Sequence, residues 1–316
     1  MTLAPAGAAT PPTGVAALGT FEFGTRALPA DVAHQLLDTY QELGGRLIDT
    51  APTYGPHSGA FLAEPLIGAW LQAVGAPGMR VITKAGLDPT RPDRGDLRPE
   101  TILASARRSA ERLGRPTILV LHRDDPTVPV GEIADAADRA VGEGLAEQVG
   151  ASNWTTARLN AWTTYAAAAR LAAPALTAPL WSLAARADPP AEPWLVEADP
   201  AHLDMAARHG MTLTPYRTLA AGYLAARHSG RHRAHHSAAY DTAAGRGRRA
   251  RLHQVAAALG MTPHGLALAW LRAHRPAPVI PVIGPRTPEQ LAQSMAGAAQ
   301  ADRVTPALAA YLQDGP

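Results

Sequence analysis

The chain has 316 residues and a formal net charge of +2, so its total charge does not call for a nucleic acid or an acidic membrane as a partner. It contains no cysteine, which excludes disulfides, thiolate chemistry and cysteine-ligated metals. Hydrophobic residues make up 47% of the sequence, enough for a large core, and α/β barrels of this length form one domain.

The first residues, 1–14, are small and rich in proline, without a basic segment or a long apolar core. They are predicted to form a disordered leader rather than a signal peptide. The rest, residues 15–316, is predicted to form a single catalytic domain. No uncharged run reaches the length of a transmembrane helix, so we expect a cytoplasmic protein.

Strand-like and helix-like segments alternate along the rest of the chain. The predicted strands cover residues 15–23, 47–49, 80–84, 117–122, 147–152, 176–183, 211–219 and 279–283. The predicted helices cover residues 29–43, 60–74, 99–113, 130–141, 154–171, 201–209, 248–259, 263–274 and 287–299. Eight strand–helix units without a spare strand predict a closed (β/α)8 TIM barrel of parallel strands rather than an open doubly wound sheet. The first strand is not followed by Gly-x-Gly-x-x-Gly, so a Rossmann domain has no support.

Three consecutive predicted strands end in titratable side chains. Asp49, Lys84 and His122 occupy these ends, and Tyr54 follows Asp49 by five residues. Parallel α/β folds build their active sites at the C-terminal ends of the strands. We therefore expect these four side chains to meet in one site.

Lys84 carries a second signal, because it is the sole lysine in a chain whose other basic side chains are arginine or histidine. Arginine cannot replace a compact ammonium whose proton affinity can be tuned. A functional role is therefore expected for Lys84, against the alternative that it survived by chance on the surface.

Six short motifs on successive strand ends resemble those of the aldo-keto reductases. The motifs are Ile48-Asp49-Thr50-Ala51-x-x-Tyr54-Gly55, Ile82-Thr83-Lys84, Leu121-His122-Arg123, Gly150-Ala151-Ser152-Asn153, Pro215-Tyr216-x-x-Leu219-Ala220 and Ile283-Gly284-x-Arg286-Thr287-x-x-Gln290-Leu291. The resemblance spans residues 19–295, nearly the whole chain. It implies a barrel that binds NADPH/NADP+ without a Rossmann domain and reduces aldehydes or ketones, with a catalytic tetrad of Asp49, Tyr54, Lys84 and His122.

The chemistry of this tetrad can be argued from the side chains themselves. Hydride transfer to a carbonyl carbon creates an alkoxide that needs a proton, and Tyr54 is the predicted donor. A tyrosine has an ordinary pKa near 10, and a neighbouring Lys84 ammonium is expected to lower it. Asp49 would hold Lys84 in place, and neutral His122 could donate a hydrogen bond to the carbonyl oxygen.

The resemblance also implies a set of cofactor-binding residues after the strands. These are Gly19, Thr20, Ser152, Asn153, Tyr216, Leu219, Ala220, Gly222, Arg286, Gln290 and Ser294. Within this set, Ser152 and Asn153 would hold the nicotinamide amide, Tyr216 would stack on its ring, and Arg286 would meet the 2′-phosphate. Gln290 and Ser294 would lie near the adenine.

Two alternatives stay open for these residues, and the sequence departs from the family at one position. Asn153 could be only the N-cap of a helix that starts at Trp154, and Arg286 could be a solvated loop charge. Ala178 stands where the family usually has a glutamine that also binds the nicotinamide amide.

Several other side chains follow strand ends and suggest a substrate pocket. Phe23, Leu87 and Trp154 are predicted to line it, whereas three other tryptophans fall on apolar helix faces and are expected in the core: Trp70, Trp162 and Trp270. Asp88, Arg123 and Asp124 at the same rim indicate a hydroxylated substrate.

The segment 227–251 is rich in arginine and histidine. A nucleic-acid patch or a metal-binding tract is possible, but a loop that covers the cofactor, or a plain solvated segment, is the favoured interpretation. We expect no bound metal, a small carbonyl substrate as the partner, and a monomer or weak homo-oligomer. The sequence thus predicts an NADPH-dependent carbonyl reductase. Alternatives are a sugar or polyol dehydrogenase working in the oxidative direction, and a regulatory barrel that binds NADPH with little turnover.

Overall fold

The computed structural model describes residues 14–57, 60–87, 94–115, 117–187, 192–225 and 238–315. The predicted leader (except its last residue), Asp88 and residues 227–237 of the basic segment lie outside these ranges. In the described part of the chain, no helix combines the length and the apolar character needed to cross a membrane.

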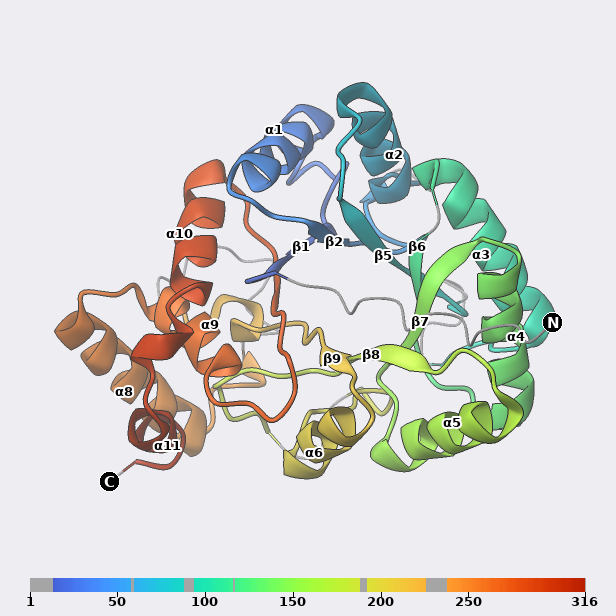
Figure 1. Ribbon diagram of the computed structural model, residues 1–316. Coiled ribbons are helices and arrows are strands. Elements are labelled where there is room, and N and C mark those ends of the chain that lie inside the picture. Colours follow the sequence, from blue (N-terminus) through green and yellow to red (C-terminus); the bar gives the residue numbers. More distant parts are fainter. Residues whose placement is uncertain are drawn as a thin grey trace.

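Eight parallel strands form a curled sheet in the centre of the molecule (Figure 1). Their order is β10-β1-β2-β5-β6-β7-β8-β9. The strands are β1 (Ala17–Gly19), β2 (Leu47–Asp49), β5 (Arg80–Ala85), β6 (Thr117–Leu121), β7 (Ala146–Ser152), β8 (Pro174–Ala178), β9 (Thr212–Leu213) and β10 (Val282–Ile283). Apart from the pair β10 and β1, each strand lies beside the strand of the same sheet that comes next along the chain, as strand–helix repeats require.

The two edges of this sheet meet. The amide of Leu213 in β9 donates a 2.8 Å hydrogen bond to the carbonyl of Pro278, and the amide of Ile280 donates one of 2.8 Å to Leu213. The segment leading into β10 therefore pairs with β9, while β10 itself pairs in parallel with β1. This closure confirms the predicted (β/α)8 barrel.

Helices surround the strands on the outside (Figure 1). They are α1 (Ala30–Glu42), α2 (Ala63–Val74), α3 (Pro99–Leu113), α4 (Val130–Gly142), α5 (Thr156–Ala169), α6 (Pro200–Arg208), α8 (Ala243–Leu259), α9 (Pro263–Arg272), α10 (Pro288–Ala298) and α11 (Pro306–Asp314), with the short 3-10 turns η1 (Ala220–Gly222) and η2 (Ala301–Arg303). Three of these helices begin with a threonine cap followed by proline. The hydroxyls of Thr262, Thr287 and Thr305 each accept a hydrogen bond from the amide three residues on, and proline suits the first helical position.

Apolar side chains divide between the two faces of the sheet. One buried cluster, which we call the inner cluster, consists of Ala17, Leu47, Ile82, Ile118, Val120, Leu176 and Ile280, with Val282 packed against it. The alternate strand residues join the larger cluster between sheet and helices, which also contains the three tryptophans expected in the core. Because successive strand residues point to opposite faces, the inner cluster fills the barrel.

Three expectations about local structure were wrong. The helix predicted at 60–74 begins at Ala63, because a small antiparallel hairpin, β3 (Pro56–His57) with β4 (Ala60–Phe61), precedes it. The helix at 287–299 is followed by α11, which packs on α8 near the C-terminus (Figure 1). The predicted strands 15–23, 176–183 and 211–219 are much shorter, since the chain turns away soon after each strand leaves the barrel.

Candidate active site

The strand period places three side chains of the predicted tetrad at the mouth of the barrel. Asp49, Lys84 and His122 each stand two residues after a member of the inner cluster, so they share its face. Those members are Leu47, Ile82 and Val120. Since β2, β5 and β6 are neighbours in parallel register, their C-terminal ends bring the three groups together.

Asp49 and Lys84 form a buried ion pair. The Lys84 ammonium lies 2.9 Å from each carboxylate oxygen of Asp49 and donates a third hydrogen bond, of 2.8 Å, to the carbonyl of Thr50. Lys84 is 4% exposed and Asp49 5%. The sole lysine of the chain is therefore in the barrel and not on the surface.

Tyr54 reaches this pair from a tight turn after β2. Its amide bonds the carbonyl of Ala51, and the next residue, Gly55, has φ of 69°. A Cβ at Gly55 would lie 2.1 Å from the carbonyl oxygen of Phe23, so only glycine fits there. The turn holds the Tyr54 ring centre 4.7 Å from the Lys84 ammonium and 6.1 Å from the centre of the His122 ring.

The titration of Tyr54 and Lys84 follows from burial and charge. Burial raises the pKa of the Tyr54 phenol above its ordinary value of 10, and the Lys84 ammonium opposes that rise. The effect of Lys84 has the expected sign, but burial outweighs it, so the net lowering expected from the sequence is wrong. Burial alone would lower the pKa of Lys84, yet Asp49 and Tyr54 together raise it, which keeps the ammonium charged.

His122 is a neutral imidazole at neutral pH. Burial, the Lys84 ammonium and the Arg123 guanidinium hold its pKa well below 6.5. A neutral imidazole can donate one hydrogen bond without carrying a charge. The site therefore combines a protonated phenol, a charged ammonium and a neutral donor, which is the equipment needed to polarise a carbonyl and protonate an alkoxide.

The aromatic side chain beside Tyr54 is Phe21, which the sequence reasoning missed. Its ring meets Tyr54 edge to face at 5.1 Å and is 62% exposed. Phe23 is instead 1% exposed and Trp154 is fully buried, and both belong to the larger cluster between the sheet and the helices. Leu87 is half-buried. Burial gives the predicted substrate contacts of Phe23 and Trp154 no support, and they stay predictions. The chain turns at residues 21–24, where the amide of Phe23 bonds the carbonyl of Thr20. A strand pattern would put Phe21 and Phe23 on the same face, so it could not have identified Phe21 as the exposed ring.

Ser152, Asn153 and Tyr216 form one hydrogen-bonded cluster after β7. The Asn153 amide nitrogen donates to the Ser152 hydroxyl at 3.0 Å, and its oxygen accepts from the Tyr216 phenol at 2.5 Å. Asn153 has φ of 60° and is not the helix cap; that alternative is wrong, because Thr155 caps α5. The hydroxyl of Ser152 and the backbone amide of Asn153 both bond the carbonyl of Ala178, where the family glutamine is missing.

The chain after β9 is strained. Arg217, Ala220 and Ala221 all have φ between 51° and 53°, a region that costs a residue with a Cβ about 1–2 kcal/mol each. Gly222 follows with φ of 94° and is exposed. Strain of this kind gathers at functional sites. The predicted cofactor residues Leu219, Ala220 and Gly222 lie within this segment, while Gly19 and Thr20 lie at the end of β1, beside β10 and β2.

Arg286 forms a two-pronged ion pair with Glu22. Its Nε lies 3.1 Å from one Glu22 oxygen and its Nη2 lies 2.9 Å from the other. The side-chain oxygen of Gln290 accepts a 2.9 Å hydrogen bond from the backbone amide of Arg286, and the backbone amide of Gln290 donates to the hydroxyl of Thr287, the N-cap of α10. Ser294 lies on the same helix and is 6% exposed. Arg286 is therefore not simply a solvated charge.

At the rim, Arg123 and Asp124 have different partners. Arg123 is 8% exposed and its guanidinium carbon lies 3.6 Å from the ring centre of Trp194. Asp124 instead holds Arg158 with two oxygens, at 2.9 Å and 3.1 Å from its Nε. Both rim residues were expected to meet a hydroxylated substrate, but the carboxylate of Asp124 is already paired with Arg158.

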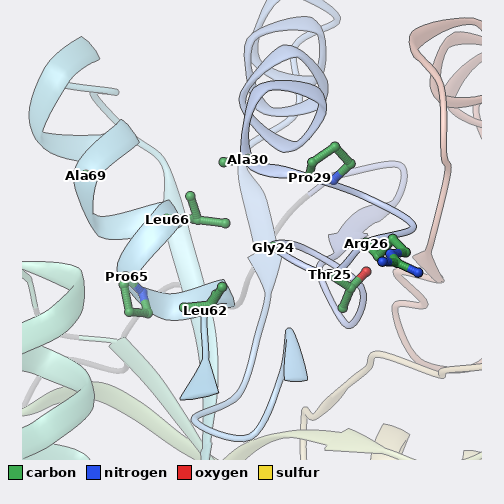
Figure 2. Close-up of a pocket in the computed structure, with 9 residues that line it drawn as sticks. All are labelled: Gly24, Thr25, Arg26, Pro29, Ala30, Leu62, Pro65, Leu66 and Ala69. Atoms are coloured by element: carbon green, nitrogen blue, oxygen red, sulfur yellow. The ribbon is translucent and has the colours of Figure 1, made fainter. Parts of the chain in front are cut away.

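A cavity of about 570 Å³ lies outside the barrel, between α1 and α2 (Figure 2). Its lining is mostly apolar and includes Gly24, Leu62 and Leu66 but none of the tetrad. Among the residues that the structure describes, no group of three or more histidines and carboxylates is placed to hold a metal.

Comparison with known proteins gives two results. Residues 17–303 match the sequence profile of the Aldo/keto reductase family. The chain is also 28% identical over 272 residues to the 6-dehydroglucose reductase of Novosphingobium aromaticivorans, covering 84% of this chain and 79% of that protein.

Proposed function

The chain belongs to the aldo/keto reductase family, and on this premise we propose that it reduces an aldehyde or ketone to an alcohol with NADPH, using Tyr54 as the proton donor. The observation that carries the proposal is the arrangement of Tyr54, the Asp49–Lys84 ion pair and neutral His122 at one end of the barrel.

Each side chain has a defined task in this reaction. The cofactor, when bound, supplies the hydride. His122 donates a hydrogen bond to the carbonyl oxygen and orients it, and Tyr54 delivers its proton as negative charge develops there. Lys84 stabilises the phenolate that remains, because an ammonium 4.7 Å from the ring centre favours the charged form. Asp49 keeps the ammonium in position.

The residues that would hold NADPH suit its chemistry. Ser152 and Asn153 offer hydroxyl and amide groups for the nicotinamide amide, and Tyr216 offers an aromatic face. In the strained segment ending at Gly222, the glycine would let the backbone approach a phosphate closely, as phosphate-binding loops do. Arg286 already holds a carboxylate in the two-pronged manner in which guanidinium groups bind phosphate.

The proposal is tested by Tyr54→Phe. Reduction of an aldehyde and ketone panel should fall by roughly 10²–10⁴, with the affinity for NADPH kept within a few fold. Tyr165→Phe is a matched control, since Tyr165 is 39% exposed on the outer helix α5. Turnover of Tyr54→Phe near the wild-type rate would refute the role of Tyr54. NADPH binding without turnover by the wild-type enzyme would favour the regulatory barrel instead.

A hydroxylated, sugar-like substrate is the second candidate. The relative from Novosphingobium aromaticivorans is a 6-dehydroglucose reductase. Next to His122, the Arg123 guanidinium stacks on Trp194 and supplies donors suited to hydroxyl oxygens. The direction of the reaction is tested with the corresponding sugar alcohol and NADP+.

Paired substrates separate the two candidates. Glyceraldehyde and propanal have equal carbon chains and differ only in their hydroxyls. A sugar-directed site should give the hydroxylated aldehyde a kcat/KM at least 10-fold higher, and Arg123→Met should reduce that preference. Equal kcat/KM for both aldehydes would leave the general carbonyl reductase as the better description.

A further inference from the structure

Glu22 lies in the loop after β1, far in sequence from the residue it binds. Its two oxygens accept hydrogen bonds from Nε and Nη2 of Arg286, 264 positions further along the chain. Glu22 and Arg286 side chains are 23% and 39% exposed, so the pair is partly shielded from water. The guanidinium edge that points toward the β1 loop is thereby occupied by a carboxylate.

The β1 loop cannot easily move away from this position. Thr20 donates through both its amide and its hydroxyl to the carbonyl of Asp49, each at 3.0 Å. The carbonyl of Phe21 accepts from the amide of Gly55, and Phe23 is buried in the core. Glu22 is therefore held near Arg286 by contacts on both sides of it in the sequence.

A carboxylate and a phosphate compete for the same arginine. Both accept the two parallel N–H bonds of a guanidinium, and two anions on one guanidinium repel each other. The competition acts on NADPH alone, because NADH has a hydroxyl in place of the 2′-phosphate.

We propose that Glu22 is a specificity-determining residue that competes with the 2′-phosphate of NADPH for Arg286 and so reduces the preference of the enzyme for NADPH over NADH. This inference rests on the proposed function, which assigns Arg286 to the 2′-phosphate. Binding of NADPH exchanges the carboxylate for the phosphate on Arg286, whereas binding of NADH leaves the Glu22–Arg286 pair intact.

Glu22→Gln keeps the shape of the side chain and removes its charge. The dissociation constants of NADPH and NADH are measured by quenching of tryptophan fluorescence, without any turnover. The variant should bind NADPH about 2–5-fold more tightly, in the range of a partly exposed ion pair, and NADH within 2-fold of wild type. Raising the salt concentration should shrink the gain, since both anions are screened. Glu132→Gln, an exposed change on α4, controls for net charge.

The Arg286→Ala background shows whether the gain passes through Arg286. There, Glu22→Gln should change NADPH affinity less than 2-fold. An unchanged or weaker NADPH affinity in the Glu22→Gln single variant overturns the inference and makes Glu22 a support that positions Arg286. A gain that persists without Arg286 also overturns it. If neither the wild type nor any variant binds NADPH, the proposed function itself fails, and this inference with it.

Discussion

Replacing Lys84 by methionine tests whether the Asp49–Lys84 pair is the buried element on which the site depends. The substitution keeps an unbranched side chain that is shorter only by the terminal ammonium, and it leaves the Asp49 carboxylate, whose side chain is 8% exposed, without its partner. Removing one partner of a buried ion pair costs about 3–5 kcal/mol. Urea unfolding at pH 8 should show a loss of that size in the free energy of unfolding, together with loss of aldehyde reduction.

The pH dependence of the loss identifies its cause. An unpaired buried Asp49 has a pKa above its unfolded value, so it can fold in its protonated form at lower pH. The cost of Lys84→Met should therefore be smaller at pH 5 than at pH 8. The double variant Asp49→Asn with Lys84→Met should regain most of the stability but none of the activity. A loss below about 1 kcal/mol at pH 8 for Lys84→Met would refute the reasoning.

Two further predictions concern the tyrosine turn and the histidine. Gly55→Ala should lower the free energy of unfolding by more than about 2 kcal/mol and abolish activity, because its Cβ would meet the Phe23 carbonyl at 2.1 Å. Gly44 is the control: it has φ of 80° but open space around it, so Gly44→Ala should cost only about 1 kcal/mol and keep activity. In the folded protein the pKa of His122 lies well below 6.5, so the free energy of unfolding should fall as pH drops below about 6.5, by up to roughly 1.4 kcal/mol per pH unit. His122→Gln should flatten that pH dependence, as measured by urea unfolding at several pH values.

The barrel and the positions of the tetrad could be predicted because they depend on local signals. Short continuous apolar runs, each ending in a polar group, predict buried strands, and the alternation of side chains along a strand then decides which of them face the mouth. The bounds of α3 agree with the prediction because a proline opens the helix and a glycine follows its last residue. The start of α11 carries the same Thr-Pro pair as α9 and α10, so that signal was present and was missed.

Other features could not be predicted because they depend on contacts between distant parts of the chain. The β3–β4 hairpin is too short to show a strand period, and Ala60 and Phe61 fit a helical pattern equally well. The Glu22–Arg286 pair joins two loops that only barrel closure brings together. The net direction of the Tyr54 pKa depends on how deeply the ring is buried, which no motif reports.

The closure of the barrel also sets an order of events during synthesis. Ala17 and Leu18 of β1 pair with Val282 and Ile283, so one edge of the first strand stays open until these two later residues have been made. At about 5–20 residues per second, that edge waits roughly 13–50 s on the ribosome. The nascent barrel passes this interval as an unclosed sheet with an exposed edge, which makes it a substrate for chaperones and gives a truncated product a strong tendency to aggregate.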